Sequence, residues 1–438
     1  MSGWRNPAWV VILAGISAAL HVGKLPPALP VLRDALGISL VQSGFLLSMV
    51  QLAGMSLGLA VGLTADGRGL KRSLLTGLLL LTGAGAWGGW ATDASSLIAL
   101  RALEGLGFLL VAMPAPSLLR QLVPPQRLFN TLGIWSTYMP VGTALALLSG
   151  PFFMAWAGWQ MWWWCTAGVS LLMALWVWLG VPSDAERRAQ GLAATGQGAA
   201  PGSPHPWPQR LRQTLRAPGP WLVALSFAVY SSQWLAVIGF LPSMYAQAGM
   251  QGSTSAVLTA LAALSNLVGN LASGRLLQRG VPAQRLLYLG FVGMTLGAFV
   301  AFAAWPQVVS TAASLGSLGS PGGLGDNSLF SPTWRFAAVL VFSAVGGIIP
   351  GTLFSLSVQL APNERTVSTT VGFMQQWSAM GQFVGPPLVA WLASRAGHWH
   401  LTWWATGACS LAGLWLALQV GRQLAAQAGR QSLHPGPP

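Results

Sequence analysis

Charged residues are scarce in this chain. Of its 438 residues 7% are charged, and 8 acidic residues stand against 22 Lys and Arg. A soluble domain of this length carries a far larger charged fraction. Cysteine is equally rare: Cys165 and Cys409 both lie in apolar stretches, which excludes a disulfide framework and a cysteine metal cluster. The sequence also lacks a GxxxxGK[ST] loop, so nothing in it supports an ATP-driven mechanism.

Long apolar runs take the place of the missing charge. About 20 apolar residues form a helix long enough to cross a hydrocarbon core of about 30 Å. Twelve such runs predict an all-α polytopic membrane protein, with spans at 8–28, 42–63, 73–91, 95–117, 130–151, 160–181, 220–241, 255–274, 284–304, 334–357, 368–392 and 400–420. The lipid bilayer is therefore the first partner that we expect.

The positive charges are distributed unevenly between the loops. With a cytoplasmic N-terminus, nearly all Lys and Arg residues fall in cytoplasmic segments, and only Arg33, Arg335 and Arg395 fall outside. The positive-inside rule then predicts a multi-pass protein of a bacterial inner membrane with both termini in the cytoplasm. Because the basic residues are spread over separate loops and form no single stripe, we expect no nucleic-acid partner.

The chain divides into two six-helix halves. The expected units are an N-terminal bundle, a cytoplasmic linker, a C-terminal bundle and a cytoplasmic tail, at 1–181, 182–219, 220–420 and 421–438. The string GLTADGRGLKR from Gly62 aligns without a gap with GNLASGRLLQR from Gly269. Duplication of a six-helix unit explains this repeat, and chance recurrence of Gly-Arg turns is the alternative. Two bundles that face each other form a cavity that can open to either side, which suits transport.

Away from the span ends, three charged residues lie inside the predicted spans: Lys24, Arg101 and Glu104. Each costs about 2.5 to 3.5 kcal/mol on insertion scales, so such residues usually have a function. Arg101 and Glu104 are three positions apart on one helix face, where they can pair. A carboxylate beside a guanidinium can exchange its partner for a proton or a substrate, which makes this pair a candidate coupling element. The alternative is a structural ion pair that fixes helix packing.

Lys24 follows His21 by three residues, so both side chains share a face of the first span. An ammonium near an imidazole forms an electropositive site suited to a carboxylate or another small anion. The alternative is that Lys24, close to the outer boundary, extends to the lipid headgroups.

Uncharged polar residues within the spans are further candidates to bind the solute through hydrogen bonds. They are Tyr138 in the fifth span, Tyr230 and Gln233 in the seventh, and Gln375 and Gln376 in the eleventh. The alternative for each is a hydrogen bond between two helices. The predicted substrate-binding set therefore joins these five residues to Lys24, His21 and Arg101, while Glu104 with Arg101 is the predicted proton-coupling pair.

Two segments resemble the major facilitator superfamily. GLTADGRGLKR is similar to its loop between the second and third helices at Gly62, Asp66, Gly69 and Lys71, with Arg72 one place from the usual basic position. RALEGLGFLL is similar to the fourth-helix motif of the family. The resemblance implies a fold of two pseudo-symmetric six-helix bundles and a gating role for the loop residues. The first helix and GFLPSMY resemble the cyanate and nitroimidazole transporter group, where the cation corresponding to Lys24 is usually arginine.

These features predict a secondary active transporter that moves a small anionic or polar organic solute by alternating access. A proton gradient or the gradient of the solute itself supplies the energy. Efflux of neutral or cationic drugs or metabolites is one alternative, and a transporter-like sensor that binds solute without moving it is an alternative of another class. An enzyme would need clustered His or carboxylate groups, whereas the 5 histidines are scattered. We expect a monomer with no cofactor and no metal.

Overall fold

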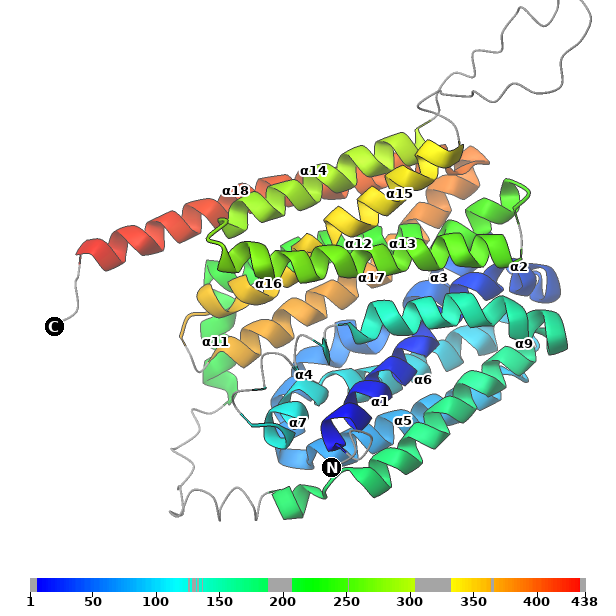
Figure 1. Cartoon of the computed structure of the whole chain (residues 1–438), viewed down its shortest axis with the longest axis horizontal. Coiled ribbons are helices and arrows are strands. Elements are labelled where there is room, and N and C mark those ends of the chain that lie inside the picture. The colour runs from blue at the N-terminus through cyan, green and yellow to red at the C-terminus, as the bar shows by residue number, and fades with distance from the viewer. Residues whose placement is uncertain are drawn as a thin grey trace, which may run out of the picture.

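The computed structural model describes residues 6–124, 127, 131, 134, 135, 137–187, 207–250, 252–303, 332–363 and 366–433. For 62–68, 207, 332, 368 and 428–433 it describes the backbone alone. Throughout these residues the regular elements are helices (Figure 1).

In the part of the N-terminal half that the structure describes, there are eight helices. They are α1 (Pro7–Gly23), α2 (Leu25–Leu36), α3 (Leu40–Met49), α4 (Leu52–Arg68), α5 (Leu70–Gly88), α6 (Ala94–Ala112), α7 (Ala115–Leu122) and α9 (Tyr138–Gly180). Short breaks divide the first, second and fourth predicted spans, so α1 with α2, α3 with α4, and α6 with α7 each form one crossing.

The second half begins with α11 (Trp207–Arg216) and α12 (Pro218–Gln247). It continues through α13 (Ser253–Gln278), α14 (Ala283–Phe302), α15 (Pro332–Gly346), α16 (Ile348–Gln359), α17 (Val367–Ala396), the short η4 (Trp399–Leu401) and α18 (Thr402–Leu433). Helix α11 lies within the segment predicted as a linker, and α18 runs on through residues 421–433 of the segment predicted as a tail. The predicted domain boundaries themselves stay predictions.

The membrane-spanning prediction is confirmed. Within the described residues, nine helical stretches are long and apolar enough to cross a membrane. One of them, α9, has non-helical backbone at Ala157 and Gly158 and holds both the fifth and the sixth predicted span. The third and eleventh predicted spans coincide with α5 and α17, which are not among these nine stretches. Lys71 and Arg72 lower the mean hydropathy of α5, and glutamines lower that of α17. The fold is therefore an all-α, polytopic membrane fold.

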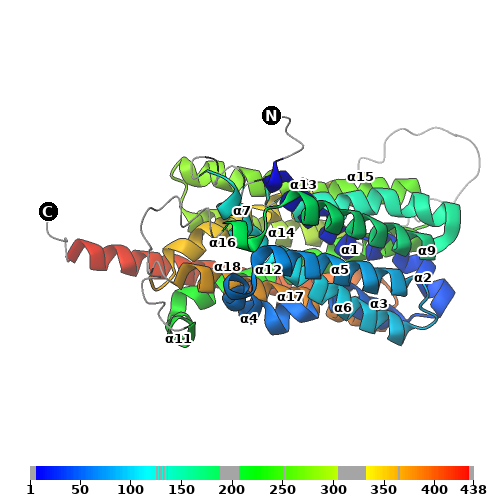
Figure 2. The same cartoon turned by 90° about the horizontal axis from the view of Figure 1, so that it is seen from below.

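The long helices lie side by side and give the bundle two distinct ends. Helices α4, α7 and α11 mark one end, which we call the α11 end, and α2 marks the opposite end, which we call the α2 end (Figures 1 and 2). A buried cluster at the α2 end joins the two halves, because Leu46 and Leu47 of α3 pack with Ala236 and Phe240 of α12 and with Val389 of α17. The halves are therefore in contact at the α2 end.

Small residues bring the second crossing close to α17. A Cβ atom added to Gly44 would lie 2.8 Å from Pro387 Cα, and one added to Gly54 would lie 3.0 Å from Ala379 Cβ. Membrane helices associate through such close packing, since lipid offers no hydrophobic penalty to separation. The two halves are therefore closely packed along α3, α4 and α17.

Candidate functional site

The site begins at the break between α1 and α2. Helix α1 ends at Gly23, Lys24 is the junction residue, and Pro26 and Pro27 open α2. Proline lacks the amide hydrogen that would continue the ladder of α1, which favours a new helix at this point. Carbonyls at the junction accept bonds from side chains instead: Trp162 Nε1 donates to Lys24 O at 3.0 Å, and Arg101 Nη1 donates to His21 O at 2.6 Å.

Helix α6 carries the two charged residues that complete the site. Asp93 caps this helix by accepting a hydrogen bond from Ser96 N at 2.9 Å. Arg101 and Glu104 follow on one face, and glycines on α6 permit backbone contact with its neighbours. A Cβ atom at Gly105 would lie 2.3 Å from Val50 O, so α6 presses directly on the end of α3.

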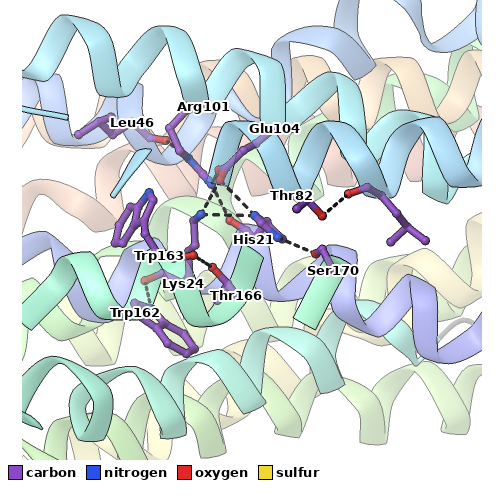
Figure 3. A network of polar contacts seen from close by, with 11 residues as sticks. His21, Lys24, Leu46, Thr82, Arg101, Glu104, Trp162, Trp163, Thr166 and Ser170 are labelled. Carbon is purple, nitrogen blue, oxygen red and sulfur yellow. Dashed lines mark hydrogen bonds and ion pairs between the residues drawn. The ribbon is translucent and has the colours of Figure 1, made fainter. Parts of the chain in front are cut away.

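Glu104 bridges two cations inside the bundle (Figure 3). Its Oε2 accepts from Arg101 Nη1 at 2.5 Å, and its Oε1 accepts from Lys24 Nζ. The exposed fractions are 0% for Lys24, 0% for Arg101 and 1% for Glu104. The predicted pairing of Arg101 with Glu104 is therefore confirmed, and the alternative that Lys24 extends to the headgroups is wrong for this conformation.

His21 extends the network to the far side of Glu104. Its Nδ1 lies 3.1 Å from Glu104 Oε1 and 3.3 Å from Lys24 Nζ, while its Nε2 lies 2.9 Å from Ser170 Oγ on α9. Figure 3 shows the ring between these groups. A neutral imidazole can either donate from Nδ1 to the carboxylate or accept there from the ammonium, with Ser170 taking the complementary role at Nε2. Two hydrogen-bond patterns therefore fit the same positions.

The cluster has one more positive charge than negative charge. Lys24 and Arg101 face a single carboxylate, since His21 need not be charged. Arg101 Nη2 is buried and finds no hydrogen-bond partner among the described residues. Lys24 Nζ also lies 4.7 Å from the centroid of the Trp163 ring, which offers a cation–π contact and no negative charge. An electropositive site with a spare donor is what an anion would require.

Helices of the N-terminal half supply all of the polar partners described for this cluster. Arg101 Nε reaches Leu46 O of α3 at 3.4 Å, and Ser170 and Trp162 come from α9. Gly85 of α5 leaves room for the imidazole, because a Cβ atom there would lie 3.0 Å from His21 Cε1. The charged cluster is thus within one half, behind the surface that meets the other.

The uncharged candidates are not part of this cluster. Tyr138 stacks on Trp135 with 4.4 Å between ring centroids. Tyr230 Oη accepts from Asn266 Nδ2 at 2.9 Å, and Gln233 Oε1 accepts from Ser410 Oγ at 3.0 Å. These hydrogen bonds join α12 to α13 and to α18. Tyr230 and Gln233 therefore make bonds between helices, which was the alternative to binding the solute.

Amide side chains connect the two halves. Gln376 Nε2 of α17 donates to Met55 O of α4 at 2.7 Å. Gln51 Nε2, at the start of α4, donates to Gln382 Oε1 at 3.0 Å. Gln375 precedes Gln376 on α17 and is half-buried. The polar contacts described between the halves therefore come from neutral groups.

The predicted gating loop is anchored by a residue that sequence reasoning missed. Asp184, beyond the end of α9, accepts from the backbone amides of Lys71 at 3.1 Å and Arg72 at 3.3 Å. It also pairs with Arg187. Gly69 has φ +97°, and a Cβ atom on it would lie 2.5 Å from Asp184 Oδ2, so glycine is required here. The side chains at Gly62 and Asp66 are outside the described residues.

The surroundings of Asp184 favour its charged form. Partial burial by itself would raise the pKa of this carboxyl. The amide hydrogen bonds from the start of α5 and the charge of Arg187 outweigh burial, and the net effect lowers the pKa below its ordinary value. The carboxylate thus caps α5 and complements the positive end of its helix dipole.

Ser170, Trp163 and Asp184 were absent from the sequence-based candidates. Ser170 is 149 positions from His21, and neither its type nor its spacing gives a signal. Trp163 was one of many tryptophans. Asp184 could have been suspected, because it is one of only 8 acidic residues in the chain. Among the described residues no group of three or more His, Cys, Asp or Glu could hold a metal ion.

Comparisons with known proteins show what this chain is similar to. A family model described as Major Facilitator Superfamily matches residues 10–366. The cyanate transport protein of Escherichia coli (strain K12) is 24% identical over 292 residues, which cover 66% of this chain and 71% of that protein. The galactose-proton symporter of the same strain is 26% identical over 178 residues, covering 40% of this chain and 36% of that protein. A crystal structure of a D-xylose-proton symporter superimposes with a TM-score of 0.71 at 16% identity, over 96% of this chain and 97% of that one.

Proposed function

The chain belongs to the major facilitator superfamily, and we propose that it moves a small anionic or polar organic solute by alternating access, coupled to protons at Glu104. Family membership makes it a multi-pass membrane transporter and not an enzyme. From the distribution of Arg and Lys we further propose that the α11 end faces the cytoplasm of a bacterial cell, with both termini on that side, and that the protein acts as a monomer.

The buried charged cluster carries this proposal. Lys24, Arg101 and Glu104 are each at most 1% exposed, although each charge inside a span costs about 2.5 to 3.5 kcal/mol. A purely structural cluster would be expected to balance its charges and satisfy its donors. This one has an excess cation, and Arg101 Nη2 lacks a described partner. Both features support a site that takes up negative charge.

Exchange of partners gives a mechanism in which charge balances. A proton on Glu104 would remove the negative charge that holds Arg101 Nη1 and Lys24 Nζ. An anionic solute could then take the place of the carboxylate against these two donors. One proton and one monovalent anion together leave the net charge of the cluster unchanged. His21 is positioned to pass the proton, since its ring nitrogens contact both Glu104 and Ser170.

The names of two relatives are compatible with an anionic or polar solute and with proton coupling. One is a cyanate transport protein and another is a galactose-proton symporter, so an anion and proton coupling both occur by name among proteins similar to this chain. Lysine at position 24 offers a compact charge without the planar fork of arginine, so we propose no preference for a planar anion.

The proposal is tested by counterflow in liposomes that contain the purified protein, with a panel of small organic anions, neutral solutes and cations. We expect anions to exchange, and we expect Lys24→Ala and Arg101→Ala to abolish exchange while the proteins still insert into the membrane. Arg33→Ala is the matched control, because Arg33 is exposed on α2. Wild-type exchange in both cluster variants would refute the anion site. Exchange of only neutral or cationic compounds would favour the efflux alternative, and binding without exchange would favour a sensor.

Proton coupling needs a separate measurement. An imposed pH gradient should drive accumulation of the anion in wild-type liposomes. Glu104→Gln cannot take up a proton, so we expect this variant to lose gradient-driven accumulation to a greater extent than counterflow. Equal gradient-driven accumulation in the wild type and in Glu104→Gln would show that Glu104 is not the proton carrier. The anion site would still be tested by the counterflow experiment.

A further inference from the structure

Helix α11 lies across the α11 end of the bundle, with its axis turned away from the long helices (Figures 1 and 2). Two hydrogen bonds fix it to the second half: Trp221 Nε1 of α12 donates to Leu215 O at 2.9 Å, and Asn363 Nδ2 donates to Gln213 Oε1 at 3.2 Å. Thr214 is fully buried on this side. Helix α11 is therefore fixed to the second half, and one of its faces is packed against it.

The opposite face combines apolar and basic side chains. Pro208, Leu211, Arg212, Leu215 and Arg216 line a shallow, largely open surface groove of about 340 Å³. Their spacing of three, four, seven and eight residues puts them on one face of a helix. Leu215 is 40% exposed, and Arg212 and Arg216 make no ion pair or hydrogen bond with the described residues. The sequence of α11 contains no acidic residue.

This face lies at the level where the membrane surface is expected. The seventh predicted span begins at residue 220, four residues after Arg216, and α12 starts at Pro218. Ala217 between the two helices is extended, so the four residues from Arg216 to Pro220 span at most about 14 Å. Arg216 therefore lies within or close to the headgroup layer, which is about 5–8 Å deep. Leu215 is exposed and Leu211 is half-buried, beside the exposed Arg212 and Arg216. This combination is typical of a helix that lies in the interface, with the leucines toward the acyl chains and the guanidinium groups at the phosphates.

We propose that the groove on α11 binds the phosphate of an anionic phospholipid headgroup. Arg212 and Arg216 are one turn apart, so both can donate to one phosphate, and Arg favours such bidentate contacts. Leu211 and Leu215 border the same groove and contact the upper part of the acyl chains. Charge complementarity with an anionic membrane surface selects this occupant. The assignment does not depend on which solute the protein carries.

The test measures binding of dioctanoyl phosphatidylglycerol to the full chain in a neutral detergent, from the rise in the midpoint of thermal unfolding. Dioctanoyl phosphatidylcholine is the zwitterionic comparison. We expect the Arg212→Gln, Arg216→Gln double variant to weaken the apparent affinity for phosphatidylglycerol by about 10- to 30-fold, and each single variant by about fivefold. The Arg212→Lys, Arg216→Lys variant keeps both charges and should retain most of the affinity.

The matched control is the Arg279→Gln, Arg285→Gln double variant, which loses the same charge from exposed positions just after α13 and near the start of α14. We expect it to change the affinity by less than about threefold. An equal loss in both double variants would reduce the effect to general charge attraction and overturn the site. Equal stabilisation by phosphatidylcholine, or by glycerol 3-phosphate without acyl chains, would also overturn it, because the groove would then not select an anionic lipid.

Discussion

Glu104 neutralises two buried cations, so its loss should destabilise the protein more than loss of either cation alone. Glu104→Gln preserves the shape of the side chain and leaves Lys24 and Arg101 without a carboxylate, although both are 0% exposed. Removing one partner of a buried ion pair costs about 3–5 kcal/mol. Lys24→Met keeps most of the apolar stem and leaves Arg101 paired with Glu104 at 2.5 Å. It loses one charge-assisted hydrogen bond, worth about 1.5–3 kcal/mol.

Thermal unfolding of the purified variants in one detergent tests this order. We expect the wild type to unfold at the highest temperature, Lys24→Met at a lower one and Glu104→Gln at the lowest. Asp34→Asn is the control for loss of a carboxylate, because Asp34 is exposed on α2 and should leave the midpoint almost unchanged. The yield of protein in the membrane fraction shows whether each variant inserts.

The order of the unfolding temperatures of Lys24→Met and Glu104→Gln tests whether Glu104 balances both cations. If Lys24→Met unfolds at or below the temperature of Glu104→Gln, then Glu104 does not balance both cations, and the count of two positive charges against one negative charge is the wrong description of the cluster. A Glu104→Gln variant as stable as the wild type would contradict the burial of uncompensated charge in the same way.

Three further predictions concern the loop region. Because hydrogen bonds hold the pKa of Asp184 below its ordinary value, the stability that this carboxylate contributes should be full above the ordinary value and lost as pH falls through the lowered pKa. Asp184→Asn should lower the free energy of unfolding by about 0.5–2 kcal/mol at neutral pH. A loss of stability at acid pH as large in this variant as in the wild type would contradict this. Gly69→Ala should lower the unfolding midpoint more than Gly280→Ala, since both have positive φ but only Gly69 lacks space for a Cβ atom; an equal shift would count against the contact. Asp66→Asn should reduce the maximal transport rate more than the apparent affinity, and a change in affinity alone would speak against gating.

The sequence was sufficient for features that depend on local spacing. Apolar runs of bilayer length predicted the crossings, since every backbone polar group must be satisfied within a helix in lipid. The three-residue spacing of Arg101 and Glu104 predicted their ion pair, which the structure contains. His21 and Lys24 were placed on one face by the same reasoning, and their nitrogen atoms lie 3.3 Å apart.

Contacts between distant segments could not be read in this way. Lys24 and Glu104 are 80 positions apart, and their pairing depends on how α1 packs against α6. The anion predicted beside Lys24 is replaced in this conformation by a carboxylate of the chain itself. Helix α11 was missed because its ten residues carry polar and basic side chains at helical spacing inside a segment rich in Gly, Ala and Pro. Propensity in such a short stretch is weak, and packing on α12 supports the helix.

The segment that covers the charged cluster also contacts the other half, so we expect access to the cluster and separation of the halves to be linked. Arg101 Nε contacts Leu46 O, and α6 presses on Val50 O at Gly105, so the end of α3 covers the cluster. The next residue, Gln51, starts α4 and is hydrogen-bonded across the halves to Gln382. When α17 leaves α4, this bond is lost and the break between α3 and α4 is released from its partner. We therefore expect the buried site inside one half to open together with the surface between the halves, as the proposed alternating access requires.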